Sequence, residues 1–200
     1  MIRRAHERSI AAGGGVEIAF ALIRAIREES EIPISLMTYA NPIIVRGEGR
    51  FYQDAAEAGA DAILVVDMPP EEGAILLQQK RLDPVFIIAP STPPDRIRLL
   101  GSLGRGFLYL VSAPGVTGRR SHLPEDLGDR VRGVKELSAL PVAVGFGIGS
   151  AETAYEAVMA GADAVVVGSA ISEMIGAAPH HPTPGVAEVI ETIRSGMNRV

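Results

Sequence analysis

The sequence predicts an α/β fold: a TIM-type (β/α)8 barrel of which about six βα units are visible. Short apolar runs alternate with segments of helical spacing along all 200 residues. The apolar runs lack polar alternation, which indicates strands buried on both faces and paired in parallel. Two passages, Ala58 to Asp67 and Ala160 to Ser169, repeat one pattern of helix end, glycine turn and apolar strand.

The elements are expected to alternate strictly. Strands are predicted at Pro33 to Tyr39, Ala62 to Met68, Pro84 to Pro90, Phe107 to Ala113, Pro141 to Gly147 and Ala164 to Ala170. Helices are predicted at Val16 to Ser30, Gly47 to Ala58, Glu71 to Lys80, Pro93 to Leu103, Pro124 to Leu137, Ala151 to Ala160 and Pro184 to Ser195. No linker or low-complexity tract divides them, so residues 1–200 are predicted to form a single, partial phosphate-binding barrel domain.

Composition limits the function classes. The net charge of −5 offers no electrostatic surface for nucleic acid or an anionic membrane. No apolar run is long enough to span a membrane or resembles a signal sequence. The chain has no cysteine, which fits a reducing compartment, and its four histidines share no metal-like spacing. We therefore expect a cytoplasmic protein without a metal site.

The ends of the last two predicted strands indicate a phosphate site. In barrels of this class, phosphate binds in the loops after the final two strands and at the N-terminus of a short extra helix. Gly145-Phe146-Gly147 and Gly168-Ser169 occupy those two positions in that order, which favours the barrel over a doubly wound sheet with the same alternation of elements. The alternative is that Gly145 and Gly147 are only turn residues. A dinucleotide motif fits worse, because Gly149 comes one place early for Gly-x-Gly-x-x-Gly.

Other strand ends carry weaker candidates. The segment from Ser112 to Arg120 is either a loop that closes over a ligand or an ordinary exposed loop. Asp67 ends an apolar strand and is interpreted as a reactive carboxylate or as a structural acceptor of backbone N–H groups. Tyr39 and Tyr109 line a pocket or pack in the core, and Asn41-Pro42 is interpreted first as a turn.

Several stretches together resemble the alpha subunit of tryptophan synthase. They are Leu36 to Pro42, Val65 to Glu72, Ile87 to Pro93, Gly106 to Tyr109, Val111 to Ser112 with Gly115 to Gly118, Gly145 to Ile148, and Val167 to Ile171. The resemblance covers essentially the whole chain in the family's order. Indole-glycerol-phosphate synthase shares the phosphate loops, but the Pro-Pro-Glu-Glu and Gly-Val-Thr-Gly stretches favour the alpha subunit.

The resemblance implies a lyase that cleaves indole-3-glycerol phosphate to indole and glyceraldehyde 3-phosphate by a retro-aldol route. It implies an α2β2 assembly in which pyridoxal phosphate is bound only by the beta subunit, and no cofactor in this chain. It places Gly118, Phe146, Gly147, Gly168 and Ser169 around the phosphate, Tyr109 in the indole pocket and Thr117 on a closing loop. Asn41 and the turn around Pro69 would face the beta subunit.

The family's two catalytic carboxylates have no counterpart in this sequence. In the family they follow the first and second strands, and Ile2 to Gly13 resembles the helix that comes after that second loop. With the phosphate strands as the seventh and eighth, one and a half to two βα units are expected to be absent from a barrel of about 250 residues. We therefore assign no catalytic residue and expect no measurable lyase activity from this chain.

Three explanations for the absence of the first βα units remain open. The chain is a lyase whose start has been assigned too late, a non-catalytic module that binds phosphate or the beta subunit, or a remnant that does not fold alone. The third is considered because two missing strands would leave barrel edges unpaired and apolar surface open. Upstream DNA distinguishes the first, and the thermal unfolding curve distinguishes the third.

Overall fold

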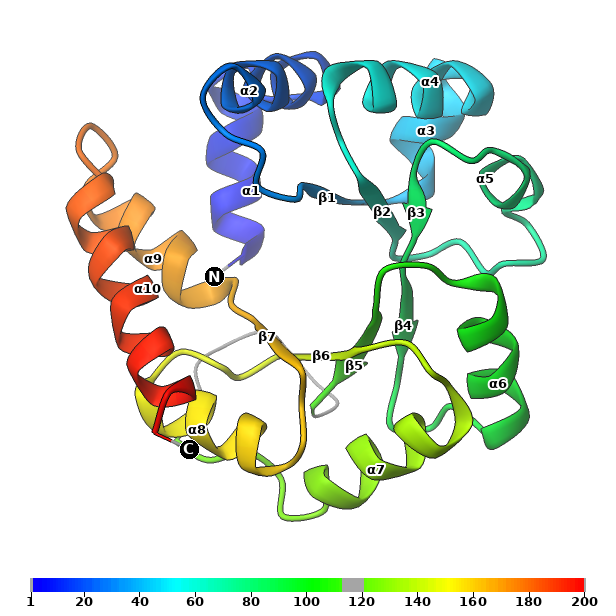
Figure 1. Ribbon diagram of the computed structural model, residues 1–200. Helices are drawn as coiled ribbons and strands as arrows, with labels where there is room; N and C mark the ends of the chain where they lie inside the picture. Colours follow the sequence, from blue (N-terminus) through cyan, green and yellow to red (C-terminus); the bar gives the residue numbers. More distant parts are fainter. Residues whose placement is uncertain (1, 113–120, 200) are drawn as a thin grey trace.

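The chain forms a curved parallel sheet with helices on its outer side, as Figure 1 shows for the computed structural model. The structure describes residues 2–112 and 121–199. The strands are β1 (Ser35–Thr38), β2 (Ala62–Val65), β3 (Asp83–Pro84), β4 (Phe86–Ile88), β5 (Leu108–Val111), β6 (Val142–Gly145) and β7 (Ala164–Val166). All pairs are parallel and sequential, in the ladders β1-β2-β3 and β4-β5-β6-β7.

The strand order confirms the barrel-type fold. A doubly wound sheet reverses its strand order and carries helices on both faces, whereas this sheet keeps one order and one helical side (Figure 1). Only Val85 separates β3 from β4, and its N–H donates to the carbonyl of Ile63 at 2.9 Å. The predicted strand Pro84 to Pro90 is therefore a staggered run that pairs first with β2 and then with β5, which gives six strand positions.

The helices follow the predicted alternation and add three elements. They are α1 (Ile2–Ala11), α2 (Val16–Glu29), α3 (Ala40–Arg46), α4 (Glu48–Ala58), α5 (Ala74–Gln78), α6 (Pro94–Leu103), α7 (Leu127–Leu137), α8 (Ala151–Met159), α9 (Ser169–Ala177) and α10 (Thr183–Met197). Of the added elements, α1 agrees with the helix suggested by resemblance, while α3 and α9 lie outside every predicted helix.

Three local predictions were wrong. Asn41-Pro42 is not a turn, because both residues lie in the first turn of α3. The strand predicted to run to Ala170 ends at Val166, since the chain turns at Gly168 and begins α9 at Ser169. The helix predicted from Glu71 shortens to α5, because turns occupy the residues before Ala74.

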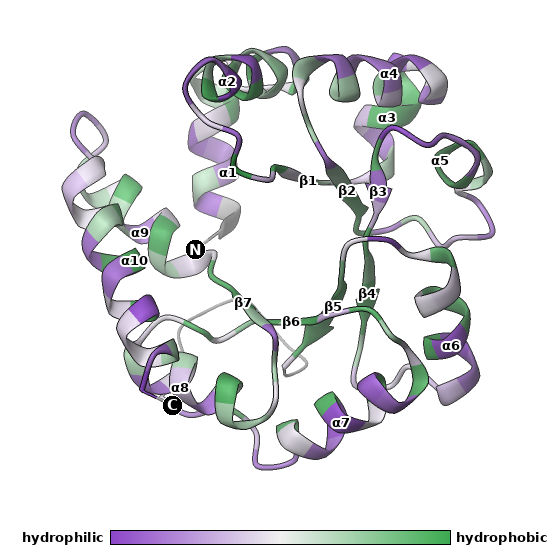
Figure 2. Ribbon diagram, viewed as in Figure 1, coloured by the Kyte–Doolittle hydropathy of each residue, from purple (hydrophilic) through white to green (hydrophobic). Residues whose placement is uncertain are grey.

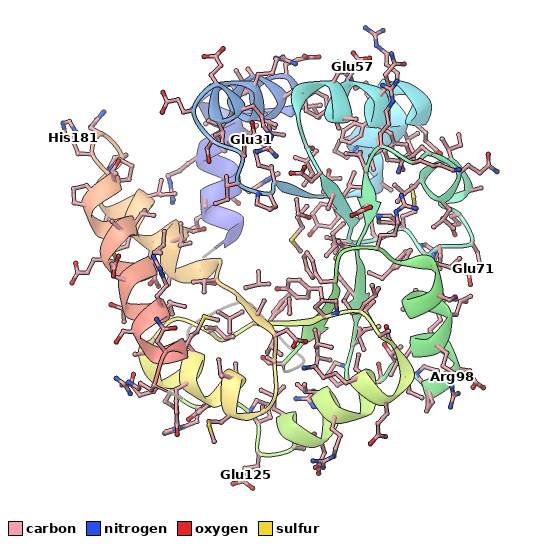
Figure 3. All side chains as sticks on the ribbon, in the orientation of Figure 1. Glu31, Glu57, Glu71, Arg98, Glu125 and His181 are labelled. Atoms are coloured by element: carbon pink, nitrogen blue, oxygen red, sulfur yellow. The ribbon has the colours of Figure 1, made fainter. Side chains whose placement is uncertain are left out.

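The core lies between the sheet and the helices. Ile63, Leu108, Val142 and Val144 are completely buried, so β2, β5 and β6 have protein on both faces, whereas the outer strands β1 and β7 are partly exposed. Figure 2 shows the apolar strands inside the ring and hydrophilic residues on the outer helical surfaces. In Figure 3, Glu57, Glu71, Arg98 and Glu125 lie at the outer rim. Burial of apolar side chains thus favours this curvature.

The two outer strands, β1 and β7, are joined by no ladder within residues 2–112 and 121–199. Helix α1 instead contacts α9, and a Cβ added at Gly176 of α9 would lie 2.9 Å from the guanidinium of Arg8. The helical layer therefore continues where the described strands do not pair. The assignment of residues 1–200 to one domain stays a prediction.

No single described helix is long and apolar enough to cross a membrane. Residues Arg4–Ala11 and Val16–Glu29 pass that test only as a pair, and the chain bends by 91° between them.

Candidate functional site

A cavity of about 350 Å³ lies at the carboxyl ends of β1, β2, β5, β6 and β7. The carboxyl ends of barrel strands are where enzymes of this fold bind ligands. Eleven residues line it: Met37, Thr38, Tyr39, Val66, Tyr109, Phe146, Gly147, Ile148, Val166, Gly168 and Ser169. Five of the seven predicted substrate-binding residues thus meet in one cavity. The other two, Thr117 and Gly118, lie outside the described residues.

Tyr109 and Phe146 form an aromatic wall of this cavity. Their rings meet edge to face, with centroids 6.2 Å apart and planes at 89°. Burial raises the pKa of Tyr109 to about 12, so its hydroxyl stays neutral at physiological pH. A Cβ added at Gly145 would lie only 2.1 Å from that hydroxyl oxygen. Glycine at 145 therefore allows the tyrosine to pack against β6.

The turn after β6 has an uncommon backbone. Phe146 has a φ of 72° and Gly147 a φ of 93°, and Phe146 is the only described non-glycine residue with positive φ. This region disfavours residues that carry a Cβ, so neighbouring contacts must stabilise it. The Ser112 hydroxyl donates to the Phe146 carbonyl, and the Ser112 N–H donates to the Gly145 carbonyl at 2.9 Å. Buried Ser112 therefore fixes this turn.

The N-terminus of α9 supplies backbone donors beside the turn. Its first helical hydrogen bond runs from Ser172 N to Gly168 O at 3.0 Å. The N–H groups of Ser169, Ala170 and Ile171 therefore precede the helical ladder and have no acceptor within it. The Ser169 side chain lies among them, and the helix dipole favours an anion at this end.

The neighbouring helix α8 is capped by its own residues. Ser150 Oγ accepts the N–H of Thr153 at 3.2 Å, and Thr153 Oγ1 accepts the N–H groups of Gly149 and Ser150, each at 3.2 Å. This reciprocal capping box occupies the N–H groups of Gly149, Ser150 and Thr153. Of the two helix ends after β6 and β7, α9 thus keeps more donors for a ligand, because no such capping box is present there.

Asp67 has the structural role that was one of its two predicted interpretations. Its Oδ1 accepts the N–H of Ala40 at 2.7 Å, at the start of α3. The carboxylate does not line the cavity, and the described lining contains no carboxylate at all. No arrangement of three or more histidine, aspartate or glutamate side chains within residues 2–112 and 121–199 could hold a metal ion. The prediction of a metal-free protein stays a prediction.

The hydrogen bond between Ala40 and Asp67 connects the two segments that carry Asn41 and Pro69, the residues predicted to contact a partner. Asn41 is exposed and follows Ala40, while Pro69 is exposed and follows Asp67 by two residues. The turn after Pro69 is fixed by an ion pair in which Arg96 Nη2 lies 2.9 Å from Glu71 Oε2. This Arg96 contact lowers the pKa of Glu71 to about 2, so the pair stays charged at neutral pH.

The site contains residues that the sequence did not reveal. Tyr39 was a pocket candidate and lines the cavity, but Thr38, Val66 and Val166 were not singled out. Ser112 and its neighbour Arg130 were also not assigned a role. A polar residue ending the apolar run Phe107 to Val111 was the one available indication for Ser112. His180 and His181 are exposed in the loop before α10, with His181 at its tip in Figure 3.

Known proteins resemble this chain over its described length. A family model described as tryptophan synthase alpha chain matches residues 1–199. The tryptophan synthase alpha chain of Geobacter sp. (strain M21) is 44% identical over 173 residues, 85% of this chain and 64% of that protein. The one from Methylibium petroleiphilum is 41% identical over 99% of this chain and 74% of that protein.

Solved structures of tryptophan synthase are also similar to this chain. A structure of the tryptophan synthase a2b2 complex from Pyrococcus furiosus superimposes with a TM-score of 0.89 and 35% identity, over 96% of this chain and 79% of that chain. The chain spans about two thirds of the length of its curated relatives, 64% for the Geobacter sp. (strain M21) protein.

Proposed function

Because the chain belongs to the tryptophan synthase alpha chain family, we propose that it binds indole-3-glycerol phosphate for retro-aldol cleavage in tryptophan biosynthesis. One observation carries the proposal: a single cavity is lined by Tyr109 from β5, Phe146 and Gly147 after β6, and Gly168 and Ser169 after β7. The lining of this cavity thus combines donors for an anion with an aromatic wall.

The phosphate is proposed to bind between α9 and the turn after β6. The free N–H groups of the first turn of α9, the Ser169 hydroxyl and the Gly147 backbone are the supporting donors. Since the chain has a net charge of −5, attraction for a dianion must be local rather than spread over the surface. Gly118 and Thr117 are proposed to complete this part of the site on family resemblance alone.

The indole ring is proposed to lie against Tyr109 and Phe146. The two rings offer an apolar surface beside Val66 and Val166, which suits a flat aromatic ligand. The neutral Tyr109 hydroxyl places no charge next to the ring.

Cleavage needs groups that this lining does not supply. Breaking the bond between indole C3 and the glycerol chain requires a proton at C3, removal of the proton from the adjacent glycerol hydroxyl, and a carboxylate near the ring nitrogen. The described lining contains no carboxylate. We therefore expect this 200-residue chain to bind the substrate without cleaving it, which keeps a binding module as the second candidate function.

The beta subunit is the proposed partner, through Asn41 and the turn around Pro69. Both residues are exposed, and the Asp67–Ala40 hydrogen bond connects their segments. Pyridoxal phosphate is proposed to belong to that subunit, with no cofactor in this chain. Cytoplasmic location stays a prediction.

Calorimetric titration tests the proposal with indole-3-glycerol phosphate, indole and glycerol 3-phosphate as separate ligands. Ser169→Ala should lower the affinity for both phosphate esters about tenfold, because a hydrogen bond to a charged group is lost. The affinity for indole should not change. Ser172→Ala, one turn along α9, is the matched control. Failure of the unmodified chain to bind either ester would contradict the proposed site. Cleavage of the substrate would contradict the expected inactivity, and stimulation of a beta subunit without cleavage would favour the binding module.

A further inference from the structure

Ser112 connects the end of β5 to the turn that follows β6. It is completely buried, and it donates twice to consecutive carbonyls: its N–H to Gly145 and its hydroxyl to Phe146. The regular pairing of the two strands ends at Val111 and Gly145. The Ser112 hydroxyl therefore adds a hydrogen bond just past the point where the ladder stops.

This hydrogen bond fixes the direction of a donor in the proposed phosphate site. The peptide between Phe146 and Gly147 is planar and trans, so its N–H points opposite to its carbonyl. Holding the Phe146 carbonyl toward Ser112 thus aims the Gly147 N–H away from β5. Since Phe146 has an unfavourable φ of 72°, this orientation needs an external contact to persist.

Arg130 holds Ser112 in turn. This α7 residue donates from its guanidinium to the Ser112 carbonyl, and only 17% of its side chain is exposed. Its Nε lies 3.3 Å from Asp126 Oδ2, which is an ionic contact without hydrogen-bond geometry. Within the described residues, that Nε is the one buried side-chain nitrogen or oxygen atom without a hydrogen bond. The hydrogen bond of the Arg130 guanidinium is thus the one to the Ser112 carbonyl.

We propose that Ser112, held by Arg130, is a positioning residue that orients the Phe146–Gly147 peptide for phosphate-ester binding. Neither side chain lines the cavity, so both act through the backbone of the turn. The inference rests on the proposed function, because it concerns the affinity of the same site for the phosphate group.

The test compares affinities for glycerol 3-phosphate and for indole in three variants and two controls. Ser112→Ala should raise the dissociation constant of glycerol 3-phosphate about tenfold, because the hydrogen bond to the Phe146 carbonyl is lost. Arg130→Met should raise it about threefold, because Arg130 contacts Ser112 and not the turn itself. The constant for indole should change less than twofold in both. Ser112→Thr keeps the hydroxyl and should restore most of the phosphate affinity.

Matched controls remove the same groups elsewhere. Ser102→Ala removes an exposed hydroxyl that donates to the Leu99 carbonyl at 2.8 Å. Arg132→Met removes an exposed guanidinium from the same helix as Arg130. Both should leave the two affinities unchanged.

The outcomes separate the inference from the proposed function. If the unmodified chain binds no glycerol 3-phosphate, the proposed function fails and the inference fails with it. If it binds the ester but Ser112→Ala binds equally well, or loses ester and indole affinity in equal ratio, the positioning role alone is overturned. If Ser112→Ala does not fold, Arg130→Met decides by the same ratio. A displaced Gly147 amide resonance in ligand-free Ser112→Ala, absent in Ser102→Ala, supports the inference.

Discussion

The Asp163 carboxylate joins three segments, so its removal should lower stability by a predictable amount. Its Oδ2 accepts the N–H of Val142 at the start of β6 at 2.8 Å, and its Oδ1 lies 2.8 Å from Nζ of Lys135 on α7. Val142 is completely buried, so its N–H would lose its partner in Asp163→Ala. An unsatisfied buried donor costs about 1–3 kcal/mol, and a half-exposed ion pair adds at most about 0.5 kcal/mol.

We expect Asp163→Ala to lower the free energy of unfolding by about 2 kcal/mol, or Tm by about 4–8 °C for a chain of this length. Asp163→Asn keeps an acceptor for Val142 and loses only the ion pair, so it should cost less than about 1 kcal/mol. Asp129→Ala is the control, since that carboxylate is 77% exposed and, among the described residues, forms an ion pair only with Arg132. Urea unfolding followed by circular dichroism measures all three variants.

The pH dependence makes the test stricter. Burial opposes ionisation of Asp163, but the hydrogen bonds from Lys135 and Val142 outweigh it and lower its pKa below the ordinary value of 3.8. The resulting stabilisation is fully present above that value and is lost as pH falls through the lower folded-state pKa. The stability difference between the unmodified chain and Asp163→Asn should therefore shrink as the pH falls below about 4 and close below the folded-state pKa. Equal losses in the Asn and Ala variants at pH 7, or a difference that does not shrink as the pH falls below about 4, would refute the reasoning.

Three further predictions follow from the site. Gly145→Ala should destabilise the chain by about 1–3 kcal/mol in urea unfolding and weaken indole binding, because the added methyl group would lie 2.1 Å from the Tyr109 hydroxyl oxygen. An unchanged affinity for indole would contradict this prediction. Since burial raises the pKa of Tyr109 to about 12, Tyr109→Phe should give the same absorbance titration at 295 nm as the unmodified chain up to about pH 11. A step near pH 10 that the variant lacks would be the opposing result. Glu156→Ala should cost about 1–2 kcal/mol in thermal unfolding at pH 7, because Glu156 accepts the Leu123 N–H at 2.7 Å; Glu152→Ala on the same helix is its control, and equal Tm values would count against it.

Local patterns predicted the strands and their order well, because the strands are continuously apolar and the central ones, β2, β5 and β6, are buried on both faces. The repeated Ala-Gly-Ala-Asp passages also predicted the turns correctly, and Gly59 and Gly161 have φ of 104° and 91°. The function of the repeated aspartates was not predictable. Asp61 accepts the Ile34 N–H at 2.7 Å, and Asp163 accepts that of Val142 across 21 residues. Such partners depend on the register of neighbouring strands, which one sequence does not specify.

The two helices missing from the prediction have the same kind of cause. Asn41-Pro42 favours a turn by local propensity, yet α3 begins there because Asp67, 27 residues later, accepts the Ala40 N–H. The apolar run from Ala164 has no periodicity that distinguishes a strand from a helix, so the change at Gly168 was not visible. Tertiary contacts override local preference at both places.

The motif Gly145-Phe146-Gly147 was predicted to bind phosphate, and this stays a prediction. Glycine at such a position lets the backbone approach an anion. Gly147 has a φ of 93° and lines the cavity, which suits that purpose. Gly145 lies in β6 and makes room for Tyr109 instead, while Phe146 between them has the left-handed backbone expected of glycine. One motif thus combines a constraint from the aromatic wall with one from the anion side. A substitution at Gly145 should therefore change indole affinity first, and one at Gly147 should change phosphate affinity first.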